Sequence, residues 1–370
     1  MTALGIIFSS IHNETVEEIT RKRTSAAIPF GGRYRLIDFP LSNFINAGVK
    51  NVGVLVRKNY ASLMDHIGSG VDWDLARKNG GLRVFPPFAS HNTDYVYQSR
   101  LEALRGILPY LNRSKEDVVI LTDSDSVNVI NYTEALAEHE EHNADMTLIY
   151  KNMVVTEDLT DNLSIVLDKD SKVTKASLKS RKGLTANVVI NACIINRELL
   201  ITLIYDSISN GASSFHRDII FDNVNSLRVF GYEYKDNYVR MISLANYYKA
   251  NLMLLNKETR DVLFNSNRRI YTKVSDSAPT RYGKEAKIEN SFIADGCEIE
   301  GTVINSVLFR GVKVAKGTVI KNSVLMDETK VGSKCELNCV ITDKRATITD
   351  NVKVGGCEKQ PYYLSKNLTI

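Results

Sequence analysis

The sequence lacks the features that would direct a protein to a membrane, out of the cell or onto a nucleic acid. Its 370 residues contain no apolar run near the ~20 residues that a membrane span requires. The first five residues have none of the basic character that begins a signal peptide. The formal net charge is only +4, which gives no case for nucleic-acid binding. We therefore expect a cytoplasmic protein that binds neither a membrane nor a nucleic acid.

The sequence is also poor in residues that bind metals or form disulfides. Its cysteines are few, odd in number and widely spread: Cys193, Cys297, Cys335, Cys339 and Cys357. Such a set predicts buried, reduced thiols rather than a disulfide framework, and no second close pair follows Cys335 and Cys339 to complete a zinc site. His139 and His142 are three residues apart, not the four of a zinc-binding H-E-x-x-H helix, so we interpret them as a solvated helix end.

What is present indicates an α/β protein of two domains. The length suits two domains, and a hydrophobic content of 44% is enough for a sizeable core. Residues 4–8, 52–56 and 118–122 are short apolar runs typical of buried parallel strands. Residues 41–47 have apolar side chains at helical spacing, and residues 251–265 are expected to form a helix that closes the first domain.

From about residue 287 the apolar residues recur every six positions. The pattern is seen at Ile293 and Ile299, in the series Leu308, Val314 and Ile320, and then at Val331 and Leu337, and at Ile348 and Val354. A six-residue repeat of this kind predicts a parallel β-helix with one apolar side chain pointing inward per repeat. We therefore expect a first domain at residues 1–265, a linker at 266–286, and a left-handed β-helix with a C-terminal tail at 287–370.

The segment around Gly31 and Gly32 is the most informative part of the chain. The two glycines permit a tight turn, and Arg33 and Arg35 place two guanidinium groups, which bind phosphate well, beside it. Taken alone, such a turn could serve packing only. Residues 29–43, PFGGRYRLIDFPLSN, nevertheless closely resemble a signature of bacterial and plant glucose-1-phosphate adenylyltransferases, the ADP-glucose pyrophosphorylases. The resemblance extends over almost the whole chain and implies a Rossmann-like nucleotidyltransferase domain with a mixed, mainly parallel sheet.

The chain departs from this family where the family binds ATP. The family pattern after the first strand is A-G-G-x-G-[TS]-R-L, whose glycines cradle phosphates. Here Ser10, Ile11 and Asn13 stand at the glycine positions, and Thr15 replaces the catalytic arginine. Ser25 stands at the lysine of a lysine–proline pair. Arg100 and Leu101 replace small residues of the family, so we expect both to crowd the space of the nucleotide.

The metal and sugar-phosphate positions are only partly retained. A carboxylate at the carboxyl end of a parallel strand is well placed to hold Mg2+, and the resemblance assigns that role to Asp125. Lys179 matches the lysine that grips the sugar phosphate. The family's second metal-binding aspartate corresponds to Arg240, and a cation cannot ligate Mg2+. Asp125 and Lys179 are therefore the only remnants of the catalytic set, and Asp125 is at most a weak metal site.

Three hypotheses follow from these losses. The first is a regulatory, catalytically impaired subunit of the GlgD type, which requires no cofactor itself and assembles with a catalytic, Mg2+-using subunit in a hetero-oligomer, a tetramer in its simplest form. The second is an active sugar-phosphate nucleotidyltransferase with a displaced metal site around Asp125. The third is a subunit that binds a sugar-phosphate effector without turnover through Arg33, Arg35, Arg57 and Lys179.

Overall fold

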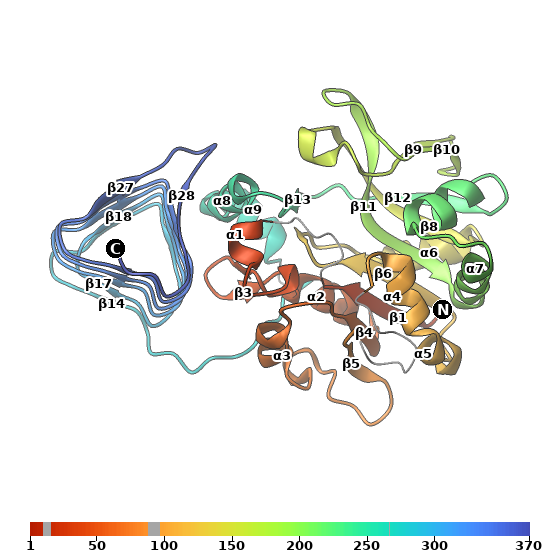
Figure 1. The fold of residues 1–370 in the computed structure, drawn as a ribbon, viewed down its shortest axis with the longest axis horizontal. Helices are drawn as coiled ribbons and strands as arrows, with labels where there is room; N and C mark the ends of the chain where they lie inside the picture. The colour runs from red at the N-terminus through yellow and green to blue at the C-terminus, as the bar shows by residue number, and fades with distance from the viewer. Residues whose placement is uncertain (10–15, 88–96, 266) are drawn as a thin grey trace.

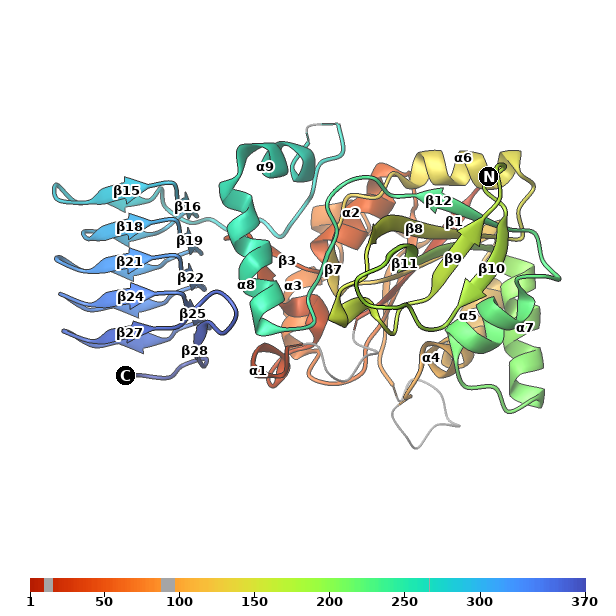
Figure 2. The same cartoon turned by 90° about the horizontal axis from the view of Figure 1, so that it is seen from above.

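The computed structural model describes residues 1–9, 16–87, 97–265 and 267–370. Figure 1 and Figure 2 show two parts, an α/β part that contains the N-terminus and a stack of flat coils that contains the C-terminus. The positions expected to lack the phosphate-binding glycines and the catalytic arginine, Ser10, Ile11, Asn13 and Thr15, lie outside the described residues. None of the described helices is long and apolar enough to cross a membrane.

A nine-stranded mixed sheet forms the centre of the first part. Seven strands run in the order β10-β9-β11-β6-β1-β4-β5, β8 also pairs with β11, and β12 pairs with β8. The strands β6, β1, β4 and β5 are parallel, whereas β11 is antiparallel to β6, β8 and β9. The expected mixed sheet is confirmed. The strands are β1 (Ala3–Phe8), β4 (Asn51–Leu55), β5 (Gly81–Phe85), β6 (Val118–Asp123), β8 (Met146–Val154), β9 (Ser164–Leu167), β10 (Val173–Ser177), β11 (Thr185–Asn196) and β12 (Val229–Glu233).

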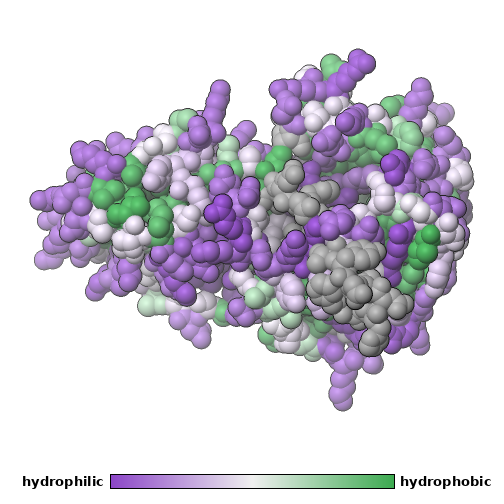
Figure 3. Space-filling view, in the orientation of Figure 1, coloured by the Kyte–Doolittle hydropathy of each residue, from purple (hydrophilic) through white to green (hydrophobic). Residues whose placement is uncertain are grey.

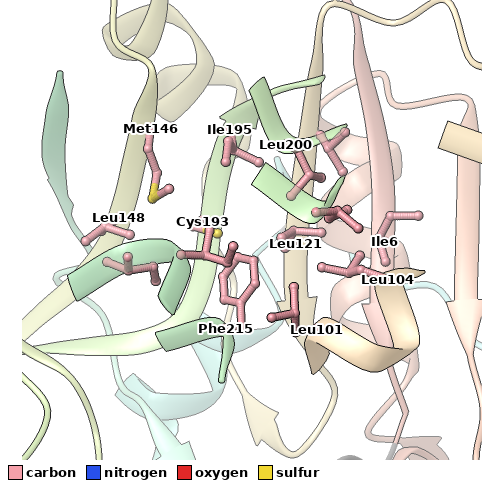
Figure 4. Close-up of a cluster of buried hydrophobic side chains, with 14 of the residues drawn as sticks. Ile6, Leu101, Leu104, Leu121, Met146, Leu148, Cys193, Ile195, Leu200 and Phe215 are labelled. Carbon is pink, nitrogen blue, oxygen red and sulfur yellow. The ribbon is translucent and has the colours of Figure 1, made fainter. Parts of the chain in front are cut away.

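Helices cover both faces of this sheet. The α-helices described in the first part are α1 (Glu17–Thr20), α2 (Asp38–Asn46), α3 (Ala61–Ile67), α4 (Arg100–Gly106), α5 (Leu108–Arg113), α6 (Tyr132–Glu141), α7 (Arg197–Ser209), α8 (Leu244–Leu252) and α9 (Lys257–Leu263), of which α1, α8 and α9 pack toward the β-helix. Side chains of α4, α5 and α7 share one apolar cluster with one face of β1, and Figure 4 shows part of it. Side chains of α2, α3 and α6 share a second cluster with the opposite face. Burial on both faces explains why the central strands are continuous apolar runs.

The glycine-turn segment is packed tightly on β1. A side chain at Gly5 would place its Cβ 2.5 Å from the ring of Phe44 on α2, so the glycine permits this close approach. The helix begins at Asp38, three residues earlier than expected, and the Asp38 carboxylate accepts a hydrogen bond from the backbone N–H of Arg35 at 2.9 Å. Asp38 also contacts His66 Nε2 at 2.6 Å, so His66 has a structural partner. This packing positions β2 (Pro29–Phe30) and β3 (Tyr34–Arg35) beside the second part.

The second part is a parallel β-helix, as the six-residue repeat predicted. Three five-stranded parallel sheets form its sides, in the arrangement of a left-handed β-helix. The sheets are β14-β17-β20-β23-β26, β15-β18-β21-β24-β27 and β16-β19-β22-β25-β28, with bounds β14 (Arg281–Tyr282), β15 (Lys287–Glu289), β16 (Phe292–Ile293), β17 (Glu298–Ile299), β18 (Thr302–Ile304), β19 (Val307–Leu308), β20 (Lys313–Val314), β21 (Val319–Lys321), β22 (Val324–Leu325), β23 (Lys330–Val331), β24 (Glu336–Asn338), β25 (Val340–Thr342), β26 (Thr347–Ile348), β27 (Lys353–Gly355) and β28 (Tyr362–Leu364). Seven of the nine repeat residues are buried, and Ile293 and Val354 are partly exposed.

The two parts are joined by a shared apolar cluster. It combines β-helix residues such as Phe309 and Met326 with Phe39, Tyr247 and Leu254 of the first part. The single helix expected at residues 251–265 is instead the end of α8, a 3-10 turn (Met253–Leu255) and α9. Side chains of α8 and α9 pack with β-helix residues in the shared cluster at this point. The first paired β-helix strand, β14, lies inside the stretch expected to be linker.

Two further expectations can be compared with the structure. Four cysteines are buried free thiols as expected, but Cys357 is exposed. The interpretation of His139 as part of a solvated helix end was wrong, because His139 is 1% exposed and contacts Thr147 Oγ1 at 2.8 Å. His142 stacks on the ring of Phe230.

At the C-terminal end of the β-helix, Figure 3 shows apolar side chains surrounded by hydrophilic ones. The backbone of Ile370 forms hydrogen bonds with the backbones of Thr347 and Thr349.

Candidate functional site

The candidate site lies at the carboxyl end of β6, where the sequence placed the retained aspartate. Asp123 ends this strand, and Asp125 follows in the turn that leads to β7 (Ser126–Val127). The two side chains are 6% and 5% exposed. Buried carboxylates require partners, because an isolated charge in a protein interior is strongly destabilising. Their partners therefore define what the site can do.

Arg240 is the cationic partner of Asp125. It lies on β13 (Val239–Arg240), which pairs antiparallel with β7 and aligns Arg240 with Ser126. Its Nε donates to Asp125 Oδ2 at 2.8 Å, and the guanidinium is only 10% exposed. Burial by itself would lower the pKa of Arg240, but the charge of Asp125 outweighs it, so the pKa is raised and the cation is permanent.

This donor set does not fit Mg2+. Mg2+ is held by carboxylates, water and phosphate oxygens in near-octahedral geometry, whereas Asp125 shares its position with a guanidinium. No group of three or more metal-binding side chains occurs within the described ranges. We therefore derive no step through a metal ion at this position.

Arg100 makes the corresponding contact with Asp123. At the start of α4, its Nε donates to Asp123 Oδ1 at 3.0 Å, and a second nitrogen contacts Oδ2. Its Nη1 lies 2.8 Å from His216 Nε2, and its guanidinium lies 5.9 Å from the centre of the Phe8 ring. The cavity that remains beside these side chains is about 10 Å³, no more than one water molecule needs.

The expectation for Leu101 was wrong. We expected Leu101 to crowd the nucleotide space together with Arg100. Leu101 is instead fully buried in the core near Leu121 and Phe215, as Figure 4 shows. The phase of α4 turns Leu101 toward the sheet and leaves Arg100 at the edge of the site.

Lys179 and Ser25 occupy different surroundings. Lys179 is exposed in the loop of residues 177–183, here called the lysine loop, and its ammonium group has no partner among the described side chains. The loop is tied down at Ser180, whose N–H donates to Thr160 O at 2.9 Å. Ser25 is buried, and its hydroxyl donates to Ser9 O at 2.6 Å, beyond the end of β1. Ser25 thus secures the backbone where the family signature has a lysine.

The structure separates the four residues proposed to bind a phosphorylated ligand. Arg57 is buried beyond β4 and donates to Gln98 Oε1 at 2.6 Å. Lys179 lies on the lysine loop. Only Arg33 and Arg35 come together, in a pocket of about 540 Å³ between the hairpin of β2 and β3 and the β-helix.

This interdomain pocket is rich in cations. The charged and polar side chains that line it come from both parts of the chain and include Arg33, Arg35, His66, Lys273, Arg310, Asp327, Glu328, Lys344 and Arg345. Three cations have acidic partners in the pairs Arg310–Asp295, Lys344–Asp327 and Arg345–Glu328. Burial lowers the pKa of Lys344 and of Arg35, with Asp327 and Asp38 respectively offsetting part of this effect. An anion in the pocket would therefore stabilise both charged groups.

Comparisons with known proteins identify the family. A nucleotidyl transferase family model matches residues 12–175, and a GlmU-like C-terminal hexapeptide model matches residues 275–362. The chain is 33% identical over 366 residues to the glycogen biosynthesis protein GlgD of Bacillus subtilis (strain 168), which covers 99% of this chain and 96% of that protein. It is 34% identical over 318 residues to a glucose-1-phosphate adenylyltransferase of Clostridium botulinum (strain Alaska E43 / Type E3), with 83% and 80% covered. The chain belongs to this nucleotidyltransferase family of glycogen biosynthesis.

A further relative in the same family is the glycogen biosynthesis protein GlgD of Geobacillus stearothermophilus, 34% identical over 320 residues, with 86% of this chain and 82% of that protein covered. The sequence analysis identified Asp125 and Arg240 but did not predict that they form an ion pair. It did not identify Arg310 and Lys344 as pocket residues. The length of one β-helix coil could have indicated such contacts, because side chains 17 residues apart meet in adjacent coils, as Glu328 and Arg345 do.

Proposed function

We propose that this chain is a regulatory, catalytically impaired subunit of an ADP-glucose pyrophosphorylase in glycogen biosynthesis. The reaction of that enzyme is ATP plus glucose-1-phosphate to ADP-glucose plus pyrophosphate. The observation that carries the proposal is the buried pair of Arg240 with Asp125. Relatives named GlgD support it, and the one from Bacillus subtilis matches the chain over 99% of its length.

The chemistry explains why one pair has a large effect. Attack of a sugar phosphate on the α-phosphorus of ATP depends on positioning and on cationic stabilisation of the developing charge, usually by Mg2+ between carboxylates and phosphate oxygens. Arg240 neutralises Asp125 but offers no coordination site. Arg100 likewise holds Asp123. Both carboxylates thus form ion pairs with arginine side chains of the chain itself.

The proposed role lies in a hetero-oligomer. This chain would assemble with a catalytic glucose-1-phosphate adenylyltransferase subunit, a tetramer being the simplest arrangement, and would change the activity or effector response of that subunit through their interface. Mg2+ would serve the catalytic partner, and this chain would need no cofactor of its own.

The test is ADP-glucose synthesis by this chain alone, by a catalytic subunit of the same cell alone, and by the two co-expressed. We expect no turnover from this chain alone, and a changed rate or substrate affinity in the mixture. Robust turnover by the isolated chain, abolished by Asp125→Asn, would instead support an active nucleotidyltransferase and overturn the proposal. Identical kinetics with and without this chain would also count against it.

A second role, compatible with the first, is the binding of a sugar-phosphate effector without turnover. The interdomain pocket favours it, since Arg33, Arg35 and Lys273 lie there without a carboxylate partner in the described ion pairs. Guanidinium groups bind phosphate through paired N–H donors. A ligand that binds only the folded chain should raise its melting temperature. We expect glucose-1-phosphate or a sugar bisphosphate to do so at millimolar concentration, and no shift with either would contradict this role.

A further inference from the structure

Arg240 connects three segments that are distant in sequence. While its Nε binds Asp125, its Nη1 donates to Asn162 Oδ1 at 3.1 Å, and Asn162 is 2% exposed. Asn162 is itself fixed, because its Nδ2 donates to Val189 O on β11 at 3.2 Å. The Met241 N–H also donates to Asp125 O at 2.7 Å. The guanidinium therefore bridges the end of β6 to the segment that precedes β9.

The lysine loop is attached to the same bridge. Ser180, next to Lys179, donates from its hydroxyl to Asn162 O at 3.4 Å and from its N–H to Thr160 O at 2.9 Å. A chain of contacts thus runs from Asp125 through Arg240 and Asn162 to the residue beside the retained lysine.

Arg100 makes a second bridge from the same strand end. It binds Asp123 on one side and His216 on the other. His216 belongs to a π-helical turn (Phe215–Ile220) that follows α7. Both bridges therefore start at a carboxylate beside β6 and end on a different segment at the border of the site.

We propose that Arg100 and Arg240 are resident cations that lock the site in one conformation without nucleotide, metal or sugar phosphate. A guanidinium has a planar set of donors, so it can hold two acceptors at once in fixed geometry. Charge-assisted hydrogen bonds are strong where water is excluded, and both guanidinium groups are at most 10% exposed. The lysine loop and the π-helical turn are thus ordered by the chain's own charges. The inference extends the proposed function, because such a subunit would have a fixed rather than a ligand-dependent site.

The experiment is amide hydrogen exchange on the full-length chain. The variant Arg240→Met with Asp125→Asn removes the bridge and both charges, so it leaves no unpaired buried ion. We expect peptides covering residues 157–183 to exchange at least about tenfold faster than in the wild type, because this segment loses its anchor. Peptides of the β-helix at residues 307–342 should be unchanged. We also expect the exchange rate of residues 157–183 in the wild type to stay the same when Mg2+, ATP and glucose-1-phosphate are added.

The matched control is Arg228→Met with Asp145→Asn. This removes another arginine–aspartate pair, at 2.6 Å, which joins the starts of β8 and β12 away from the site. It should leave residues 157–183 unchanged. If the first variant does not fold, Asn162→Ala keeps the ion pair and removes the far end of the bridge, together with the side-chain bond to Val189 O, and faster exchange of the lysine loop is expected again.

Equal exchange of residues 157–183 in the wild type and in whichever bridge variant folds would overturn the inference, as would slowing of the wild type by the three ligands. The proposed function fails on a different result. Turnover by the isolated wild-type chain would refute the regulatory role, whereas the lock is judged by exchange alone.

Discussion

Arg23 of the first part and Asp343 of the β-helix form an ion pair that is buried on both sides. Arg23 Nη2 lies 2.8 Å from Asp343 Oδ1, and the two side chains are 3% and 4% exposed. Asp343 Oδ2 also accepts a hydrogen bond from Tyr363 OH at 3.0 Å. Residues 320 positions apart thus connect the segment after α1 to the last coils of the β-helix.

Removal of one partner of this pair should be strongly destabilising. Arg23→Met leaves the Asp343 carboxylate buried without its cation, at a cost of about 3–5 kcal/mol in the free energy of unfolding. Urea unfolding of the two proteins measures this difference. The control Arg345→Met removes an exposed pair with Glu328 and should cost no more than about 1 kcal/mol. Equal losses in the free energy of unfolding for the two variants would show that the buried pair stabilises the fold no more than the exposed pair does.

A metal-binding variant should follow from the position of Arg240. Arg240→Asp replaces the cation beside Asp125 with a second carboxylate, which is the ligand type that Mg2+ and Mn2+ prefer. We expect the variant to bind Mn2+ at least about tenfold more tightly than the wild type, as measured by electron paramagnetic resonance of free Mn2+. Arg240→Gln removes the cation without adding a carboxylate and should bind less tightly than Arg240→Asp. Wild-type affinity in Arg240→Asp would mean that the strand end cannot form a metal site.

Arg33 should contribute to ligand binding but not to the stability of the free protein. Its side chain is exposed at the interdomain pocket and lies over the ring of Tyr34, with its guanidinium carbon 5.6 Å from the ring centre. Arg33→Ser should weaken binding of a sugar bisphosphate about tenfold, which lowers the ligand-induced stabilisation by about 1.4 kcal/mol. Arg281→Ser, on the β-helix outside this pocket, should match the wild type in the same thermal-shift titration. Unchanged affinity of Arg33→Ser for the sugar bisphosphate would show that the ligand does not bind at Arg33.

Stability should fall below neutral pH because of His139. Burial is the main cause that lowers the pKa of His139, while its contact with Asn196 and the charges of Asp145 and Glu140 offset part of the effect. The unfolded chain therefore takes up a proton near pH 6.5, where the folded chain does not. This contribution to stability is complete above pH 6.5 and is lost as the pH falls from 6.5 toward the folded pKa.

The check is the urea midpoint of the wild type and of His139→Gln between pH 5 and 8.5. Glutamine does not titrate, so the variant should lose less stability than the wild type between pH 6.5 and 5. The two proteins should show the same pH dependence between 7.5 and 8.5. If the urea midpoints of the two proteins changed with pH in parallel over the whole range, His139 would not be the cause of the loss of stability at low pH.

Much of the fold could be predicted because its signals are local. The apolar runs at β1, β4 and β6 are long enough to require burial on both faces, and the six-residue repeat places one buried side chain per β-helix repeat. The prediction failed where several short elements compete for one space. Residues 251–265 carry helical spacing, but the junction with the β-helix divides them among α8, a 3-10 turn and α9.

The sequence by itself determined that residue 240 cannot ligate a metal, because arginine is a cation in any surroundings. It also determined the family, the β-helix repeat and the retention of Asp125 and Lys179. Only the tertiary structure decided that Arg240 reaches Asp125, that Arg100 binds Asp123 while Leu101 enters the core, and that cations of the two parts meet in the interdomain pocket. Side-chain pairing depends on how distant segments are placed relative to one another, and that placement results from packing of the whole chain.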